Sequence, residues 1–72
     1  MPITLYVCAG GPHCAAKRAE LRERGVRFDE IDVSARPDAI PELLKLTGGK
    51  RIVPVLVEGA RIRIAPDGAD VF

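Results

Sequence analysis

The sequence predicts an α/β domain built on a mixed four-stranded sheet, and the order of its apolar segments carries that prediction. An apolar run at 3–7 is followed by a charged, alanine-rich run and then by a second strand-like segment at 26–33. This β-α-β order predicts two parallel strands joined by a right-handed crossover. Two later apolar runs, 52–57 and 61–64, are separated by a short turn at Gly59, which predicts an antiparallel hairpin.

Length and composition predict one small domain over residues 1–72. The chain has 72 residues, of which 47% are hydrophobic and 29% charged, as is ordinary for a globular protein. A chain of this size buries only about 60% of the surface that its unfolded form exposes, so we expect marginal stability.

The charge balance and the hydropathy pattern exclude several classes of partner. A formal net charge of +1 gives no electrostatic reason to expect nucleic acid. There is no apolar run long enough to span a bilayer and no basic-then-apolar leader. We therefore expect a cytoplasmic monomer that binds neither nucleic acid nor membrane.

The first strand and helix are the clearest local predictions. Ile3–Val7 is apolar except at Thr4, which is typical of a central strand buried on both faces. Pro12 has no N–H and suits a first helical turn, so we expect a helix over about 12–24. Its sheet-facing side is thin, and we expect it to consist of Cys14, Ala15, Ala19 and Leu21.

The second half is predicted from spacing and turn residues. A change in the phase of alternation within 26–33 indicates a bulge or burial on both faces. Apolar residues recur at helical spacing over about 37–46, and a glycine pair ends that helix. Pro54 lies near the start of the strand at 52–57, where a proline is tolerated at an edge or bulge. The run 61–64 alternates, with isoleucines expected inward and arginines in water. Residues 65–72 read as a loop.

The chemistry is concentrated where the first strand gives way to the helix. Both cysteines and the single histidine fall within the seven residues Cys8–Cys14. Open α/β sheets bind their ligands outside the carboxyl ends of strands. Two cysteines make no disulfide framework, and a close pair in a cytosolic protein points to redox or metal chemistry. The alternative interpretation is a pair of small buried hydrophobic residues.

Four segments carry a resemblance to a known family. Residues 12–14, Pro-His-Cys, are similar to the end of Cys-Pro-Tyr-Cys, and the Gly-Val at 25–26 follows at the matching distance. Residues 28–33 resemble Y-x-E-I-D-V, and residues 47–54 resemble T-G-x-R-T-V-P. These segments, in register over about 3–64, resemble a glutaredoxin within the thioredoxin-fold superfamily. The resemblance implies a β-α-β-α-β-β fold from which the family's last helix is missing.

The resemblance also implies roles for individual residues. The proline that matches Pro54 is cis in that family and faces the active-site cysteines, and the backbone of the residue matching Val53 binds substrate. Arg51 stands where some glutaredoxins direct an arginine at a carboxylate of glutathione, a contact that arginine makes bidentately. The alternative for Arg51 is a solvated loop residue. His13 fills the family's tyrosine position, and we expect it to be exposed at the substrate side. Glutathione is thus the expected small-molecule partner, beside protein disulfides.

The main departure from the family lies at its first cysteine, whose place is taken by Gly11. Three interpretations follow. Cys8 and Cys14 form a displaced redox pair, Cys14 alone forms a mixed disulfide with glutathione, or the fold has lost catalysis and serves as a binding module. We favour thiol–disulfide oxidoreductase chemistry at Cys14 with Cys8 as its partner. Cys14 lies near a helix N-terminus, where we expect its pKa to be lowered.

A metal site is a separate hypothesis. Cys8, His13 and Cys14 offer three ligands for zinc or copper, but the spacing is unfamiliar and no fourth ligand is evident, so we expect no metal.

Two smaller departures concern the tail and the first helix. The family's I-G-G-x-D-D turn, which binds the γ-glutamyl end of glutathione, is replaced, with Asp67 or Asp70 as candidate stand-ins. Lys17 and Glu20 stand where typical members are apolar. Either the helix is rotated, or the alkyl stem of Lys17 covers the sheet while its charge reaches water.

Overall fold

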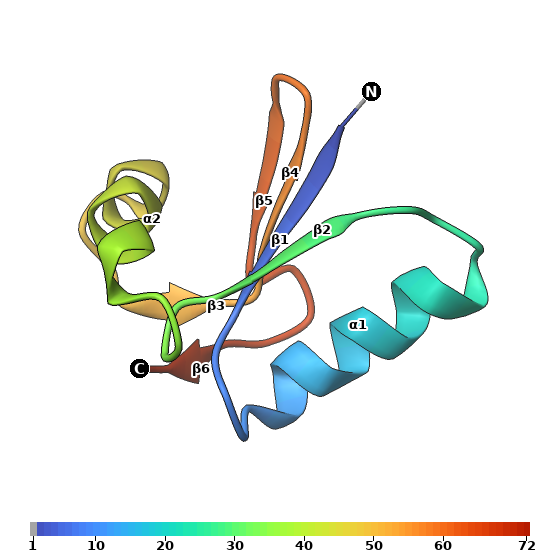
Figure 1. Ribbon diagram of the computed structural model, residues 1–72, viewed down its shortest axis with the longest axis horizontal. Coiled ribbons are helices and arrows are strands. Elements are labelled where there is room, and N and C mark those ends of the chain that lie inside the picture. Colours follow the sequence, from blue (N-terminus) through green and yellow to red (C-terminus); the bar gives the residue numbers. More distant parts are fainter. Residues whose placement is uncertain (1) are drawn as a thin grey trace.

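The computed structural model describes residues 2–72 and shows two helices arranged around a small mixed sheet (Figure 1). The elements in chain order are β1 (Ile3–Val7), α1 (Pro12–Glu23), β2 (Asp29–Asp32), the 3₁₀ turn η1 (Pro37–Ala39), α2 (Ile40–Thr47), β3 (Ile52–Val53), β4 (Val55–Glu58), β5 (Arg61–Ile64) and β6 (Asp70–Val71). Among these residues no helix is long and apolar enough to cross a membrane.

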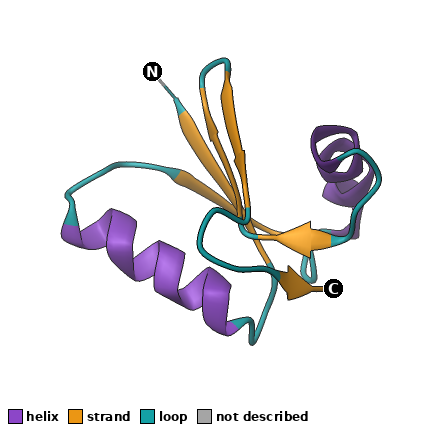
Figure 2. Ribbon diagram, turned by 180° about the vertical axis from the view of Figure 1, so that it is seen from behind, coloured by secondary structure: helices purple, strands orange, loops and turns teal. Residues whose placement is uncertain are grey.

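The main sheet has the order β2-β1-β4-β5 and confirms the predicted topology. β1 runs parallel to β2 and antiparallel to β4, so that Tyr6 lies opposite Ile31 on one side and Val55 on the other. β4 and β5 form the predicted antiparallel hairpin. The last three residues of β1 are buried, as expected for a central strand. Figures 1 and 2 place α1 and α2 on opposite sides of these four strands.

The buried face of α1 differs from the prediction. The helix buries Cys14, Lys17 and Leu21, whereas Ala15 and Ala19 are exposed. Residues three and four positions apart lie on the same helix face, so Cys14, Lys17 and Leu21 form one buried face of α1. The middle residue of this face, Lys17, is charged and forms ion pairs. The ammonium of Lys17 lies 2.5 Å from an oxygen of Asp67 and 2.7 Å from one of Glu20. This pairing allows a lysine to occupy a position where the family has apolar residues.

Proline divides the third predicted strand. The Val53–Pro54 peptide is cis, as the resemblance implies, and β3 and β4 lie on either side of Pro54. The second strand is shorter than its predicted span 26–33, because only Asp29–Asp32 pairs with β1.

Two predictions for the C-terminal part are wrong. Ile62 and Ile64 are 44% and 41% exposed, because β5 is an edge strand with a neighbour on the β4 side alone. The tail is not entirely loop, since β6 pairs antiparallel with β3 and places Val53 opposite Asp70. Residues 65–72 contain no helix. Through β6, the tail passes directly beside the segment that leads into the cis proline.

Candidate active site

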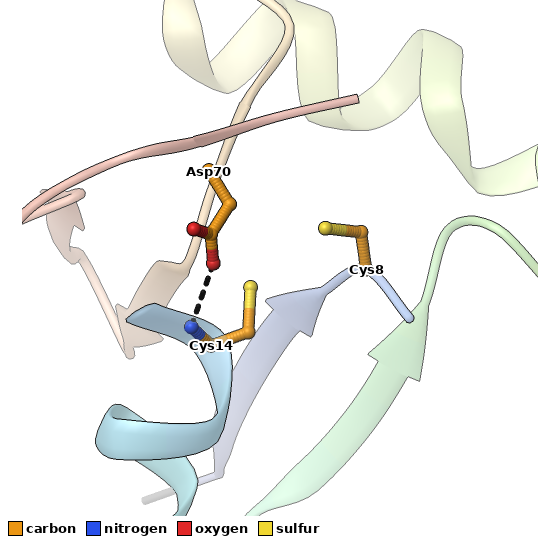
Figure 3. A group of neighbouring side chains, drawn as sticks. All are labelled: Cys8, Cys14 and Asp70. Carbon is orange, nitrogen blue, oxygen red and sulfur yellow. Dashed lines mark hydrogen bonds between the residues drawn. The ribbon is translucent and has the colours of Figure 1, made fainter. Parts of the chain in front are cut away.

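Three side chains from distant parts of the chain meet beside the start of α1. Cys8 directly follows β1, Cys14 lies in the first turn of α1, and Asp70 comes from β6. Figure 3 shows the three side chains turned toward a common space. The two sulfurs and a carboxylate oxygen all lie within 4.8 Å of one another, and both thiols are free. The structure thus brings together the two predicted catalytic cysteines and adds an aspartate to them.

Asp70 caps the helix that carries Cys14. Its Oδ2 accepts a hydrogen bond of 2.9 Å from the backbone N–H of Cys14, and this contact is buried. The first N–H groups of a helix have no partner within the helix, and the N-cap residue Gly11 has no side chain to serve them. Asp70, 56 positions after Cys14, therefore accepts the hydrogen bond that an N-cap side chain would normally accept.

Gly11 is a glycine because of the space around it. Its φ of −77° is open to any residue, but a Cβ there would lie 2.4 Å from Oδ2 of Asp70 and 3.1 Å from Sγ of Cys8. Gly11 occupies the position of the family's first cysteine. The carboxylate of Asp70 and the sulfur of Cys8 thus lie where the side chain of that cysteine would begin.

The pKa of Cys14 is raised to about 12, which overturns the expectation that the helix N-terminus lowers it. Burial is the largest cause, since Cys14 is 0% exposed, and the hydrogen bond and negative charge of Asp70 add to it. Partial burial pushes the pKa of Asp70 upward, yet hydrogen bonds from Cys14 and the nearby His13 outweigh this and lower the pKa overall. The proton of this pair therefore resides on the sulfur at neutral pH.

The other candidate residues lie around this group, not within it. His13 is exposed, and its ring packs on Gly68, where an added Cβ would lie 2.6 Å from ring atoms. Arg51 contacts Phe72 in three ways. Its Nε donates a 2.9 Å hydrogen bond to the backbone oxygen of Phe72, its own backbone oxygen accepts one of 3.2 Å from the N–H of Phe72, and its guanidinium lies 4.8 Å from the ring centroid. Val53 and Pro54 are buried, and Val53 pairs with Asp70.

The tail contains the functional residue that sequence reasoning placed least well. Asp67 and Asp70 were both candidate stand-ins for the family's aspartate pair, but only Asp70 reaches a cysteine. Asp67 binds Lys17 instead. In the sequence, Asp70 is only an aspartate two residues after Gly68. That pattern alone does not predict that it caps a distant helix.

A groove lies away from the cysteines. This groove of about 680 Å³ is lined by Pro2 and Ile3, by the end of α1 and by the segment through Phe28 into β2. It adjoins the beginning of β1, whereas Cys8 follows the end of that strand. Its lining includes neither cysteine nor histidine, so we do not assign it to the redox chemistry.

Comparison with known proteins agrees with this fold. The family model described as Glutaredoxin matches residues 3–62, and the chain belongs to the glutaredoxin family. Among solved structures it is similar to the glutaredoxin-like protein NrdH-redoxin from Escherichia coli, whose activity profile is described as thioredoxin-like. The TM-score is 0.77 at 30% identity, over 89% of this chain and 82% of that one. No curated protein matches the chain. At the level of the family, these similarities support a thiol–disulfide redox role.

Proposed function

We propose that this protein is a thiol–disulfide oxidoreductase whose redox pair is Cys8 and Cys14. The position of Cys8 is the observation that supports this proposal. Its sulfur lies 3.1 Å from where a Cβ on Gly11 would be, and within 4.8 Å of the sulfur of Cys14. Because the sulfurs lie within 4.8 Å and a disulfide is about 2.05 Å long, they have to approach by less than about 3 Å. Cys8 thus substitutes for the missing first cysteine from a different place in the chain.

The two thiols have different roles in the proposed reaction. Cys8 is 8% exposed and Cys14 is 0% exposed, so Cys8 is the thiol that meets a substrate disulfide. Its thiolate attacks one substrate sulfur, forms a mixed disulfide and releases the other sulfur as a thiolate. Cys14 then attacks the sulfur of Cys8 and closes the Cys8–Cys14 disulfide, while its proton passes to the departing second substrate sulfur, which leaves as a thiol. Two electrons pass from the protein to the substrate, and a thiol reductant restores the pair.

Glutathione and protein disulfides are the proposed partners. A carboxylate of glutathione that binds Arg51 has to compete with the contacts that Arg51 makes with Phe72. The backbone of Val53 is likewise engaged by β6. These contacts, together with the thioredoxin-like profile of NrdH-redoxin, favour protein disulfides over glutathione as substrates. We also propose that the protein acts in the cytoplasm, where thiol reductants would restore the pair after each turnover, and that it acts as a monomer.

Serine variants test the assignment. The reduced protein, Cys8→Ser and Cys14→Ser are each assayed for turnover of insulin disulfides and of glutathione disulfide. We expect both variants to lose turnover, with Cys14→Ser trapping a mixed disulfide on Cys8 that mass spectrometry detects. Ala15→Ser changes an exposed neighbour of Cys14 and should retain full activity.

The alternative function is a non-catalytic binding module, and the burial of both sulfurs is the observation in its favour. The same assay separates the two functions. If the parent protein neither turns over a disulfide nor forms an adduct, the oxidoreductase proposal fails and the binding module remains.

A further inference from the structure

The group formed by Cys8, Cys14 and Asp70 has the composition of a metal site as well as of a redox pair. We propose that the reduced protein binds one Zn²⁺ through the two sulfurs and a carboxylate oxygen of these residues. The proposal shares its cysteines with the redox function but does not depend on it, because it needs only the reduced thiols and the carboxylate.

The three ligand atoms are nearly close enough to share an ion. Zinc binds sulfur at about 2.3 Å and carboxylate oxygen at about 2.0–2.2 Å, so a tetrahedral site spaces its ligand atoms roughly 3.5–3.8 Å apart. All three atoms already lie within 4.8 Å of one another, so a contraction of about 1 Å completes the arrangement. The ligands come from the end of β1, the first turn of α1 and β6, and these elements converge there (Figure 3).

Two thiolates and a carboxylate are a donor set that suits zinc and not magnesium or calcium. Thiolates favour soft or borderline ions, while magnesium and calcium take oxygen ligands and are poorly served by two sulfurs. A carboxylate oxygen is a normal zinc ligand beside sulfur. Three protein ligands leave the fourth tetrahedral position for water or an exogenous thiol, as in zinc sites that remain open.

The surroundings hold the aspartate in place for this role. Oδ2 of Asp70 accepts the N–H of Cys14 at 2.9 Å, and such secondary hydrogen bonds orient metal-binding carboxylates. Because Gly11 has no Cβ, the carboxylate of Asp70 can occupy the space beside it. From the sequence alone, the third candidate ligand beside the two cysteines was His13. In the structure the His13 ring packs on Gly68, and Asp70 is the third residue of the group.

Zinc and the disulfide exclude one another because they use the same sulfurs. When glutathione disulfide oxidises the zinc-bound form, the two thiolates join as the Cys8–Cys14 disulfide and two electrons pass to glutathione disulfide. That molecule takes up two protons and leaves as two glutathione molecules, while Zn²⁺ is released. The site would therefore link metal occupancy to the redox state of the pair.

The test is a metal titration of the reduced, chelator-treated full chain. Co²⁺ serves as the spectroscopic probe, and Zn²⁺ is then added to displace it. We expect one equivalent of Co²⁺ to give a sulfur-to-cobalt charge-transfer band that one equivalent of Zn²⁺ removes. Both Cys8→Ser and Cys14→Ser should lose the band.

Asp70→Asn and His13→Asn form the decisive pair. Asparagine at position 70 can still accept the N–H of Cys14 but lacks the anionic ligand, so zinc affinity should fall at least about tenfold. His13→Asn should bind zinc within about twofold of the parent, the ordinary spread for a residue outside the ligand set. Circular dichroism checks that each variant is folded.

Two results would overturn the zinc proposal: no cobalt band in the parent, or a loss of affinity in His13→Asn that Asp70→Asn does not show. Neither result touches the proposed redox function, which is measured by disulfide turnover without metal. The two proposals can therefore fail separately.

Discussion

The β1–α1–β2 unit and the C-terminal segment 65–72 contribute to the candidate site in different ways. The first supplies both sulfurs from seven consecutive residues, at the point where a strand ends and a helix begins. The second supplies no sulfur, yet it places Asp70 on Cys14 and Asp67 on Lys17. The two reactive sulfurs thus come from one short segment, while the charged carboxylates beside Cys14 and Lys17 come from the far end of the chain. The predictions that follow test that division.

The largest expected effect concerns the reactivity of Cys14. With a pKa of about 12, its thiolate fraction at pH 7 is roughly one in 10⁵ and rises about tenfold per pH unit until the pKa is approached. Alkylation of Cys14 in Cys8→Ser, followed by mass spectrometry from pH 7 to 10 with chelator present, should show that slope. Adding Asp70→Asn removes a charge that raises the pKa and should speed alkylation at pH 8. A rate independent of pH would contradict this picture.

A second effect, on stability, comes from Gly11→Ala. The new methyl group would overlap Oδ2 of Asp70 and displace it from the N–H of Cys14, at a cost of about 1–3 kcal/mol in the free energy of unfolding. Urea denaturation measures the loss. In an Asp70→Ala background the same substitution should cost less, because its obstacle is gone. Equal costs in the two backgrounds would mean that Asp70 does not fill that space.

The smallest effect is expected from Lys17→Met, which keeps the buried stem and removes the contacts with Asp67 and Glu20. The Lys17 hydrogen bond and charge lower the pKa of Asp67, so its stabilising contribution exists above the unfolded value of 3.8 and disappears as pH falls through the lower folded value. The melting temperature should fall by a few degrees at most at pH 7, because Asp67 is exposed to solvent.

The destabilisation caused by Lys17→Met should disappear in strong acid, where Asp67 is protonated. Arg36→Met, which removes a 3.8 Å pair with Asp38 between exposed side chains, is the matched control and should leave the melting temperature unchanged. A destabilisation by Lys17→Met that persists at low pH would point to packing and not to the ion pair.

The parts of the fold that were predictable are those with local signals. A proline at the first helical position and the glycine at position 25 bracket α1, which ends at Glu23, one residue before its predicted end. The apolar run of β1 and the turn at Gly59 likewise predicted a strand and a hairpin, and both are present. The spacing of four family segments led to the fold and to the cis peptide at Pro54.

The parts that were not predictable depend on contacts across the chain. The burial of Lys17 depends on Asp67, 50 residues away, so periodicity alone assigned that face to alanines. Ile62 and Ile64 alternate as a half-buried strand does, but alternation does not reveal that β5 stands at an edge. The role of Asp70 depends on the path of the tail beside β3, which no local pattern in 65–72 specifies.

The most direct test of the account is a redox titration of the wild-type protein against reduced and oxidised glutathione, read by alkylation and mass spectrometry in the presence of chelator. The account predicts a loss of two hydrogens mapped to a Cys8–Cys14 disulfide, with a midpoint near the cytosolic range of roughly −220 to −320 mV. If both thiols remain free across the whole range, Cys8 does not replace the missing cysteine, and the central claim is wrong.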